Sequence, residues 1–394
     1  MGFSARDHCL FNVVMISNNS KSIYDCAIIG GGVSGLCLSI QLAMAGHSVV
    51  LFEKNEYPIH KVCGEYISME SWDFLVRLGL PLGEMNLPVI DQLGISSASG
   101  FMLNHTLKMG GFGISRYTLD ETLSQIAREK GVMLLTNCRV SGLVDLPAGL
   151  HSIQTSKGEY TSRVVCGSFG KYTPAFLQDI HAKKKADYTN YIGVKYHIKT
   201  DLAHNRIELH NFENGYCGIS KVDQGWYCLC YLTTAANLLK HNKNIKTLEE
   251  SVLYRNPFLK RYFTQSEFVY EDPLVISNIH FHEKQSHQDG IFLLGDTAGT
   301  ITPLCGNGMS MGMRASVLLG NEIENFLNNK QSKQQTLDNY QRSWTMHFGA
   351  RIKTGYYLQN LFGKNITTAL ALRFLSNFPG VTSKLVSLTH GQRF

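Results

Sequence analysis

The sequence predicts an α/β fold in which a Rossmann-like domain is interrupted by an antiparallel sheet domain and followed by C-terminal helices. Three observations support this prediction. A strand, a glycine-rich turn, a helix and a second strand fill residues 24–53, the order of a right-handed βαβ unit. Alternating, aromatic-rich segments between residues 191 and 232 indicate antiparallel strands. Residues 334–394 are mostly helical in pattern.

The individual elements follow from local patterns. Residues 24–29 are a short apolar run, typical of a strand buried on both faces of a parallel sheet. Residues 33–45 have a helical period, and residues 48–53 form the second strand. Further along, residues 116–130 predict an amphipathic helix and residues 291–294 another buried strand.

The length of the chain indicates more than one domain. At 394 residues and 44.1 kDa it exceeds what one compact core supports, so we expect two interlocked domains. The expected division is an N-terminal extension (1–23), a nucleotide-binding domain in two parts (24–180 and 279–330), an inserted substrate domain made mainly of antiparallel sheet (181–278) and a C-terminal helical region (331–394).

The composition excludes several classes of protein. Hydrophobic residues make up 44% and charged residues 17%, which argues against disorder. The net charge of +6 is not gathered into the aromatic-interleaved basic patch of a nucleic-acid-binding protein. None of the ten cysteines pairs at metal-ligand spacing, and no apolar run reaches the length of a membrane span. We therefore predict a cytoplasmic protein with reduced, mostly buried thiols and no metal site.

A Gly-x-Gly-x-x-Gly motif lies between the first strand and the first helix. Gly30 allows the tight turn, Gly32 lets the backbone approach a pyrophosphate, and Gly35 allows close packing of helix on strand. The helix offers free N–H groups and a partial positive charge to phosphates. Glu53 ends the second strand, where an acid binds ribose hydroxyls. These residues predict a dinucleotide site.

A second glycine-rich segment favours FAD as the dinucleotide. The strand at 291–294 delivers Asp296 to the carboxyl edge of the sheet, where open parallel sheets bind their ligands. A carboxylate there can accept hydrogen bonds from ribityl hydroxyls. Pro303, Gly306 and Gly308 then lead into a helix whose positive end would face the isoalloxazine and stabilise the anion of reduced flavin. The sequence therefore predicts an FAD-dependent oxidoreductase.

Four blocks of sequence lie in a characteristic order, namely IIGGGVSGLCLSIQLAMAGHSVVLFEK (28–54), GISRYTLDETLSQIAREKGV (113–132), VVCGSFGKYT (164–173) and FLLGDTAGTITPLCGNGMSMGMRAS (292–316). They resemble the group A flavoprotein monooxygenase superfamily, in particular its branch of geranylgeranyl-reductase-like and flavin-halogenase-like proteins. The resemblance implies a Rossmann-like FAD-binding domain with an inserted antiparallel β-sheet substrate domain.

The resemblance also assigns further contacts to the cofactor. Arg116 would contact FAD near its phosphates, Lys61 would lie along the cofactor, and the backbone of Val140 would meet the adenine. Lys54 follows the ribose acid, as a basic residue commonly does in the family. The full set of expected FAD-binding residues is Gly30, Gly32, Val33, Ser34, Gly35, Glu53, Lys54, Lys61, Arg116, Val140, Asp296, Pro303, Gly306, Gly308 and Met309.

The chain departs from the family pattern at three places. Ser168-Phe169-Gly170 stands where the family usually has Ala-Asp-Gly, whose Asp is tied to binding of reduced nicotinamide. Two electron sources therefore stay open, NAD(P)H itself and a separate flavin reductase or other donor. The Trp-x-Trp-x-Ile-Pro element of halogenases is absent, which disfavours halogenation. The Tyr-x-Trp-x-Phe-Pro element of geranylgeranyl reductases is also absent, and Tyr216 is the one aromatic that remains.

The C-terminal helices allow two interpretations. Residues 350–394 mix large apolar side chains with lysines and arginines. They cap the substrate cavity and pack on the core, or they form an interfacial segment that touches a membrane or a lipid-like substrate. The first interpretation is preferred, so membrane contact is not expected. Both agree with a bulky apolar substrate.

Three functions follow. The first is a monooxygenase that hydroxylates or epoxidises an apolar aromatic, polyketide or isoprenoid compound of secondary metabolism through a flavin hydroperoxide. The second is a reductase that saturates isoprenoid double bonds, and the third is a non-redox flavin-binding isomerase, cyclase or binding protein. No catalytic acid or base is assigned, although His197, His280 and His282 lie in or near strands around the substrate domain.

Overall fold

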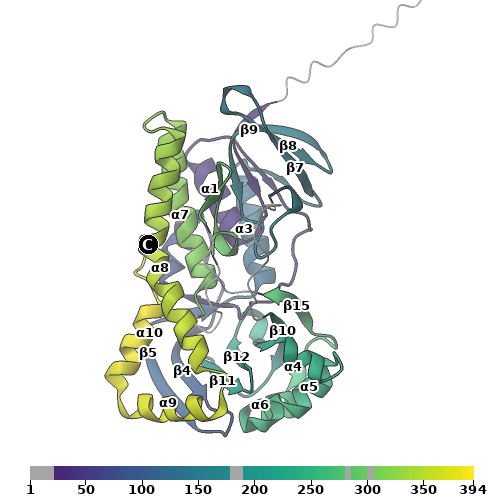
Figure 1. The fold of residues 1–394 in the computed structure, drawn as a ribbon, viewed down its shortest axis with the longest axis vertical. Helices are drawn as coiled ribbons and strands as arrows, with labels where there is room; N and C mark the ends of the chain where they lie inside the picture. The colour runs from purple at the N-terminus through teal and green to yellow at the C-terminus, as the bar shows by residue number, and fades with distance from the viewer. Residues whose placement is uncertain (1–21, 178–189, 280–284, 300–305) are drawn as a thin grey trace, which may run out of the picture.

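The computed structural model describes residues 22–177, 190–279, 285–299 and 306–394. In these residues the strands form two sheets, of eight and nine strands. Two separate clusters of buried apolar side chains lie against the two sheets. Figure 1 shows the first sheet in the upper half of the molecule and the second sheet in the lower half. A smaller third cluster holds Tyr216, Leu232 and Ile279, and the division into two interlocked domains stays a prediction.

The first sheet is mainly parallel. Its path runs β16-β17-β9-β1-β2-β6, with β7 and β8 attached beside β9. Every residue of β2 is buried, as expected for a strand covered on both faces. Its strands are β1 (Ile23–Ile29), β2 (Val49–Phe52), β6 (Met133–Leu135), β7 (Val140–Asp145), β8 (His151–Thr155), β9 (Gly158–Gly167), β16 (His287–Gln288) and β17 (Ile291–Leu293).

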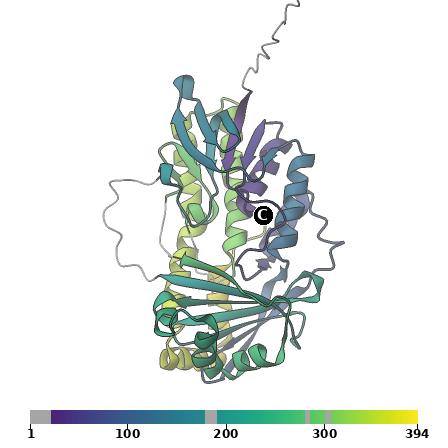
Figure 2. The same ribbon diagram turned by 90° about the vertical axis from the view of Figure 1, so that its right-hand side faces the viewer.

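The second sheet lies across the lower end of the molecule (Figure 2). Its path runs β14-β10-β13-β12-β11-β4-β5-β3, and β15 pairs with β10. Most neighbours are antiparallel, but β11 pairs with β4 in parallel. Its strands are β3 (Tyr66–Ser68), β4 (Val89–Ser96), β5 (Met102–Gly113), β10 (Tyr191–Lys199), β11 (Arg206–Phe212), β12 (Gly215–Lys221), β13 (Tyr227–Thr234), β14 (Glu267–Phe268) and β15 (Leu274–Ile279).

The composition of the second sheet differs from the expected domain division. Three of its strands, β3, β4 and β5, come from residues 66–113, which the sequence analysis places in the first part of the nucleotide-binding domain. Only the segments after residue 190 had been assigned to an antiparallel domain. The difference arises because β4 pairs with β11 more than 100 residues away, and a local sequence pattern carries no signal for such a pairing.

Helices cover both sheets. α1 (Val33–Met44) and α3 (Arg116–Glu129) lie against the first sheet. α7 (Gly308–Leu327) packs on α1, and the long α8 (Lys333–Leu361) runs beside α7 along the edge of the molecule (Figure 1). On the second sheet, α9 (Asn365–Asn377) and α10 (Pro379–Thr389) lie against β5. The shorter helices are α2 (Trp72–Leu78), α4 (Ala235–Lys240), α5 (Ile245–Ser251) and α6 (Pro257–Gln265).

Most of these helices lie where the sequence pattern predicts them. The expected helix at 33–45 is α1, and the expected helix at 116–130 is α3. Each ends beside a glycine in the left-handed region, Gly46 with φ of +88° and Gly131 with φ of +85°. None of the helices that the structure describes is both long enough and apolar enough to cross a bilayer.

Candidate functional site

The turn after β1 is built for glycine. Gly30 has φ of +109°, and its N–H donates to the carbonyl oxygen of Phe52 over 2.8 Å. A Cβ at Gly30 would lie 2.3 Å from the carbonyl oxygen of Ser168. One at Gly35 would lie 2.1 Å from the carbonyl oxygen of Gly30 itself. Both positions therefore exclude any side chain, as the motif predicts.

Gly32 differs from its two neighbours in the motif because it faces open space. A Cβ built there meets no atom within 4 Å. Gly32 is the N-cap of α1, and no side chain caps the helix. Among the described residues, therefore, no atom lies close to this position in front of the first-turn amides of Val33 and Ser34, at the positive end of the helix dipole. This arrangement fits a diphosphate.

Glu53 braces the same turn from the end of β2. Its carboxylate is buried and accepts hydrogen bonds from the N–H of Gly31 over 2.8 Å and from the N–H of Asn55 over 3.0 Å. The hydroxyl of Tyr57 donates to the carbonyl oxygen of Gly31 over 2.6 Å. The side-chain amide of Asn55 also donates to Glu53 over 3.0 Å, and because a carboxylate has about four acceptor positions, Glu53 retains capacity for a ribose hydroxyl. The neighbouring Lys54 is exposed.

The predicted flavin end of the site lies directly against the predicted phosphate end. A Cβ added to Gly295 would be 2.7 Å from Oγ of Ser34, and one added to Gly312 would be 2.2 Å from the same atom. The turn that carries Asp296 and the first half of α7 therefore both touch the start of α1. The structure brings together the two segments, more than 250 residues apart, that the sequence analysis assigns to one ligand.

The remaining residues of the flavin end lie around the start of α7. Gly308 begins the helix, which has no side-chain cap from Asn307. Gly306 has φ of +65°, and a Cβ there would lie 3.1 Å from the ring of Tyr66. Sδ of Met309 is 3.8 Å from Sγ of Cys63. Pro303 lies outside the described residues. Tyr66 is a contact that the sequence analysis missed.

The hydroxyl of Tyr66 adds a polar group to this end. The side chain is buried, and among the described residues its hydroxyl has no hydrogen-bond partner. Burial raises the pKa of this phenol, and the nearby Glu70 raises it further, so it stays protonated. A buried, unpartnered donor next to Gly306 is the type of group that a bound molecule satisfies.

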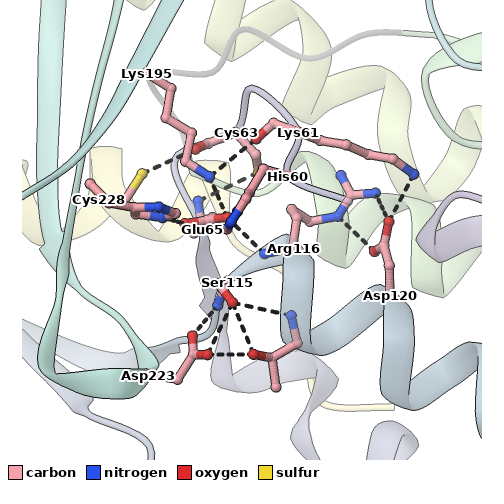
Figure 3. A network of polar contacts seen from close by, with 12 residues as sticks. His60, Lys61, Cys63, Glu65, Ser115, Arg116, Asp120, Lys195, Asp223 and Cys228 are labelled. Carbon is pink, nitrogen blue, oxygen red and sulfur yellow. Dashed lines mark hydrogen bonds and ion pairs between the residues drawn. The ribbon is translucent and has the colours of Figure 1, made fainter. Parts of the chain in front are cut away.

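Two cations share one buried carboxylate on α3 (Figure 3). The guanidinium of Arg116 donates to both oxygens of Asp120 over 2.8 and 2.7 Å, and Nζ of Lys61 lies 2.8 Å from Oδ2. Burial would raise the pKa of Asp120, but Arg116 and Lys61 outweigh it and hold that pKa below its usual value. Asp120 thus fixes the guanidinium of Arg116. The guanidinium N–H groups that do not contact Asp120 remain available to a phosphate.

A second buried cluster centres on Glu65 and links β10 of the second sheet to the start of α3 (Figure 3). Its Oε1 lies 2.5 Å from Nζ of Lys195 and accepts the N–H of Arg116 over 2.7 Å, and its Oε2 lies 2.7 Å from Nε2 of His197. Glu65, Lys195 and His197 are all buried. Burial would raise the pKa of Glu65, whereas the hydrogen bond from His197 and the charge of Lys195 lower it, with a net fall.

Sequence reasoning found part of this cluster. It singled out His197, and Lys195 two positions earlier shares the same face of β10, where a lysine in an otherwise apolar strand is the available signal. It gave Glu65 no role. The thiol of Cys228 completes a group whose possible ligand atoms with Glu65 and His197 lie within 4.8 Å. The ammonium of Lys195 already supplies, beside Glu65, the positive charge that a metal ion would bring to these ligands. His280 and His282 lie outside the described residues.

The loop at residues 168–170 contains Phe169, which replaces the expected aspartate. Hydrogen bonds hold this loop to β1 and to the turn that carries Asp296. The N–H of Ser168 donates to the carbonyl oxygen of Ile29 over 2.8 Å, and the N–H of Gly170 donates to Oγ1 of Thr297 over 2.9 Å. The same hydroxyl donates to the carbonyl oxygen of Gly170 over 3.1 Å. The ring of Phe169 packs on the apolar core beneath the loop. Thr297 therefore braces the loop that carries Phe169.

Known proteins are similar to the chain in sequence. The NAD(P)-binding Rossmann-like domain matches residues 28–59. Conditioned medium factor receptor 1 of Dictyostelium discoideum is 26% identical over 96% of this chain and 76% of its own length. Kynurenine 3-monooxygenase of Flavobacterium johnsoniae is 22% identical over 76% of this chain and 72% of its own. A digeranylgeranylglycerophospholipid reductase of Methanococcus vannielii is 19% identical over 82% of each.

Solved structures share the fold. The flavin-dependent brominase Bmp2 superposes with a TM-score of 0.78 at 18% identity, over 93% of both chains. PqsL of Pseudomonas aeruginosa, described as a probable FAD-dependent monooxygenase, superposes with a TM-score of 0.71 at 15% identity, over 88% of this chain and 99% of its own. The predicted architecture, a Rossmann-like domain with an antiparallel sheet domain and C-terminal helices, is confirmed.

The fold and the site together define the class. The chain is an FAD-dependent oxidoreductase, and the resemblance recognised in its motifs to flavin monooxygenases is confirmed as a similarity of sequence and fold. The prediction of FAD as the cofactor is likewise confirmed. NAD(P)H as the electron donor remains a prediction. The open space at Gly32, the two uncapped helix starts and the hydroxyl of Tyr66 fit such a cofactor.

Proposed function

We propose that the chain is a monooxygenase that hydroxylates or epoxidises an apolar aromatic, polyketide or isoprenoid compound. The observation that carries the proposal is the contact of the Gly295 turn with Ser34 at the start of α1, while Gly306 before α7 meets Tyr66 of the second sheet. When reduced and bound there, FAD would supply two electrons to molecular oxygen, so that one oxygen atom enters the substrate and the other leaves as water.

The residues of the chain would bind and orient the cofactor. The first-turn amides of α1 at Val33 and Ser34 would hold the pyrophosphate, and Glu53 would accept the ribose hydroxyls. Arg116, fixed by Asp120, would stand beside the phosphates. Lys54, Lys61 and the backbone of Val140 would complete the adenosine side.

The flavin end would be held from the opposite side. Asp296 would accept hydrogen bonds from the ribityl chain, and the start of α7, at Gly308 and Met309, would place its positive end at the isoalloxazine. Gly306 would keep the backbone close to the ring. The second sheet would border the substrate and exclude water from it. A titrating protein group need not take part, because the cofactor carries the redox chemistry.

Oxygen incorporation tests this function directly. Purified protein with FAD, an electron donor and isotopically labelled oxygen is incubated with a panel of aromatic, polyketide and prenyl compounds. We expect one labelled oxygen atom in the product and no product without oxygen. Consumption of oxygen that yields only reduced oxygen species across the whole panel would contradict the proposal.

A reductase is the second candidate, because a digeranylgeranylglycerophospholipid reductase is among the relatives. Such an enzyme would saturate an isoprenoid double bond by transferring a hydride and a proton. It would therefore work without oxygen. Anaerobic turnover of a prenyl compound that gains two hydrogen atoms would establish the reductase and exclude the monooxygenase. Turnover without any net redox change would instead indicate the non-redox class.

The electron donor gives a separate prediction. Because Phe169 replaces the aspartate that the family ties to reduced nicotinamide, we expect slow reduction of the bound flavin by NADPH or NADH unless substrate is present. Replacing Phe169 by Asp should raise the rate by about tenfold, which corresponds to ~1.4 kcal/mol in the barrier. Stopped-flow absorbance measures both rates.

The control variant is Tyr172→Phe, which alters a polar group three residues along the same loop and leaves Phe169 in place. It should leave the rate of flavin reduction unchanged. Fast reduction of the bound flavin in the wild-type protein by NADPH alone would show that Phe169 does not slow electron transfer from the nicotinamide.

A further inference from the structure

The positive charge of the protein is concentrated at its C-terminus. Seven of the 37 basic residues follow Asp338, and none of the 31 acidic residues does. The first 338 residues therefore hold 30 basic and 31 acidic residues and are nearly neutral. The whole excess of +6 resides in the last 56 residues, which form most of α8 together with α9 and α10.

The same helices expose a row of large apolar side chains. On α9, Ile366, Leu370 and Phe374 follow one another at intervals of four residues and are 77%, 62% and 54% exposed. Phe378 continues the row at 50% exposure, and its ring lies 4.7 Å from that of Phe374. Residues four apart lie on one face of a helix, so these side chains form a continuous stripe.

The stripe is not the face that holds α9 in place. Thr368 and Leu372 are buried, and α9 packs through them on the β5 and β11 end of the second sheet. The exposed stripe thus faces away from the core, at the lower end of the molecule where α9 lies (Figure 1). α10 continues it with Val381 and Leu388, 43% and 46% exposed. Such a patch usually marks a binding surface.

Exposed cations flank the stripe. Lys364 precedes α9, Arg373 lies within it, and Lys384 lies on α10, and all three are exposed. In the part of the chain that the structure describes, none of them forms an ion pair with a carboxylate. By contrast, the cations Arg351 and Arg393, before and after this segment, are paired with Glu70 and Asp73. Lys353, exposed on α8, also has no ion pair with a carboxylate among the described residues, and Arg373 lies over the ring of Phe101 at 5.8 Å, so unpaired positive charge lies on α8 as well as beside the apolar stripe.

We infer that the α9–α10 surface docks on an anionic lipid bilayer, with the stripe inserted at the level of the headgroups and the three cations over lipid phosphates. A helix with an apolar face and basic residues beside it binds a membrane interface in this way without spanning it. Each cation near an anionic leaflet strengthens binding by about fivefold. This orientation would also bring the molecule to a reservoir of apolar compounds.

A second copy of the chain is the competing occupant, and the charges disfavour it. In a two-fold symmetric dimer each patch meets its own copy. Lys364, Arg373 and Lys384 would then face their counterparts of the same sign, with no acidic residue after Asp338 to offset them. A lipid surface that carries negative charge complements the same residues.

Vesicle co-sedimentation of the full chain tests the inference. We expect binding to vesicles of equal parts phosphatidylcholine and phosphatidylglycerol, weaker binding to phosphatidylcholine alone, and release from the mixed vesicles by high salt. The variant Lys364→Gln/Arg373→Gln/Lys384→Gln should bind mixed vesicles at least about tenfold more weakly. Ile366→Ser/Leu370→Ser/Phe374→Ser should lose binding to both compositions.

The matched control is Val76→Ser/Leu239→Ser, which removes apolar side chains that are 47% and 61% exposed on α2 and α4. It should bind as the wild type does. Light scattering in solution gives the oligomeric state of each protein. The inference is wrong if the wild type does not bind mixed vesicles, if neither variant binds more weakly, or if the apolar variant turns a dimer into a monomer.

Discussion

Replacing Glu65 by Gln is expected to lower the free energy of unfolding by about 3–5 kcal/mol. The carboxylate is the acceptor for Lys195, whose side chain is only 1% exposed, and for His197. A neutral amide would leave the buried ammonium without its counter-charge, in a place that water does not reach. Thermal or urea unfolding of the two proteins measures the difference.

Two variants separate the loss of the ion pair from a general effect of substitution. Adding Lys195→Met to Glu65→Gln removes both charges and should restore most of the stability. Glu267→Gln breaks an exposed pair with Lys199 on the same strand β10, where the side chains are 67% and 54% exposed, and should cost less than about 1 kcal/mol. If Glu65→Gln and Glu267→Gln lowered the free energy of unfolding equally, burial of the Glu65 ion pair would not explain its contribution.

The effect of Glu65 depends on pH in a definite direction. Its pKa is lower in the folded protein than the ordinary value of 4.5. Its contribution to stability is therefore complete above about pH 4.5 and is lost as the pH falls through the lower, folded pKa. The difference in stability between the wild type and Glu65→Gln should accordingly narrow only in acid.

The second large effect is expected for Gly32→Val. Gly32 has ordinary backbone angles, φ of −77° and ψ of 177°, and a Cβ there meets no atom of the described residues within 4 Å. The protein without FAD should therefore fold with its stability changed by less than about 0.5 kcal/mol. The same side chain would fill the space in front of α1 that the pyrophosphate needs, so FAD affinity should fall by about 100-fold or more.

Gly83→Val is the matched control. Gly83 also has open space around its Cβ position, and it follows α2 rather than the dinucleotide turn. It should bind FAD as the wild type does. Gly30→Ala, in contrast, should unfold or aggregate, because its Cβ would overlap the carbonyl oxygen of Ser168 and its φ is positive. If the Gly32→Val protein failed to fold, the space in front of Gly32 would not accept a side chain, and the account of this site would be wrong.

The parts of the fold that sequence could predict are those set by neighbouring residues. The spacing of Gly30, Gly32 and Gly35 determines a turn and a helix start, and the apolar run at 24–29 determines a buried strand. Asp296 was placed at a sheet edge by the strand before it. Each of these depends on residues a few positions apart.

The parts that sequence missed depend on contacts across the chain. Glu65 meets Lys195 and His197, 130 and 132 residues later, through a loop that crosses to the second sheet. Arg116 was expected at the phosphates, but its pairing with Asp120 one helical turn away was not noticed, although the spacing of four residues would have indicated it. The parallel pairing of β4 with β11 had no local signal at all.

Titration of FAD into the protein freed of flavin, followed by calorimetry, tests the central claim most directly. If the amides at the start of α1 and the turn at Asp296 hold one ligand, the wild type and Gly83→Val should each bind one FAD per chain. Gly32→Val should bind none in the same concentration range while unfolding at the same temperature without FAD. Equal uptake of FAD by all three proteins, or none by the wild type, would contradict the account.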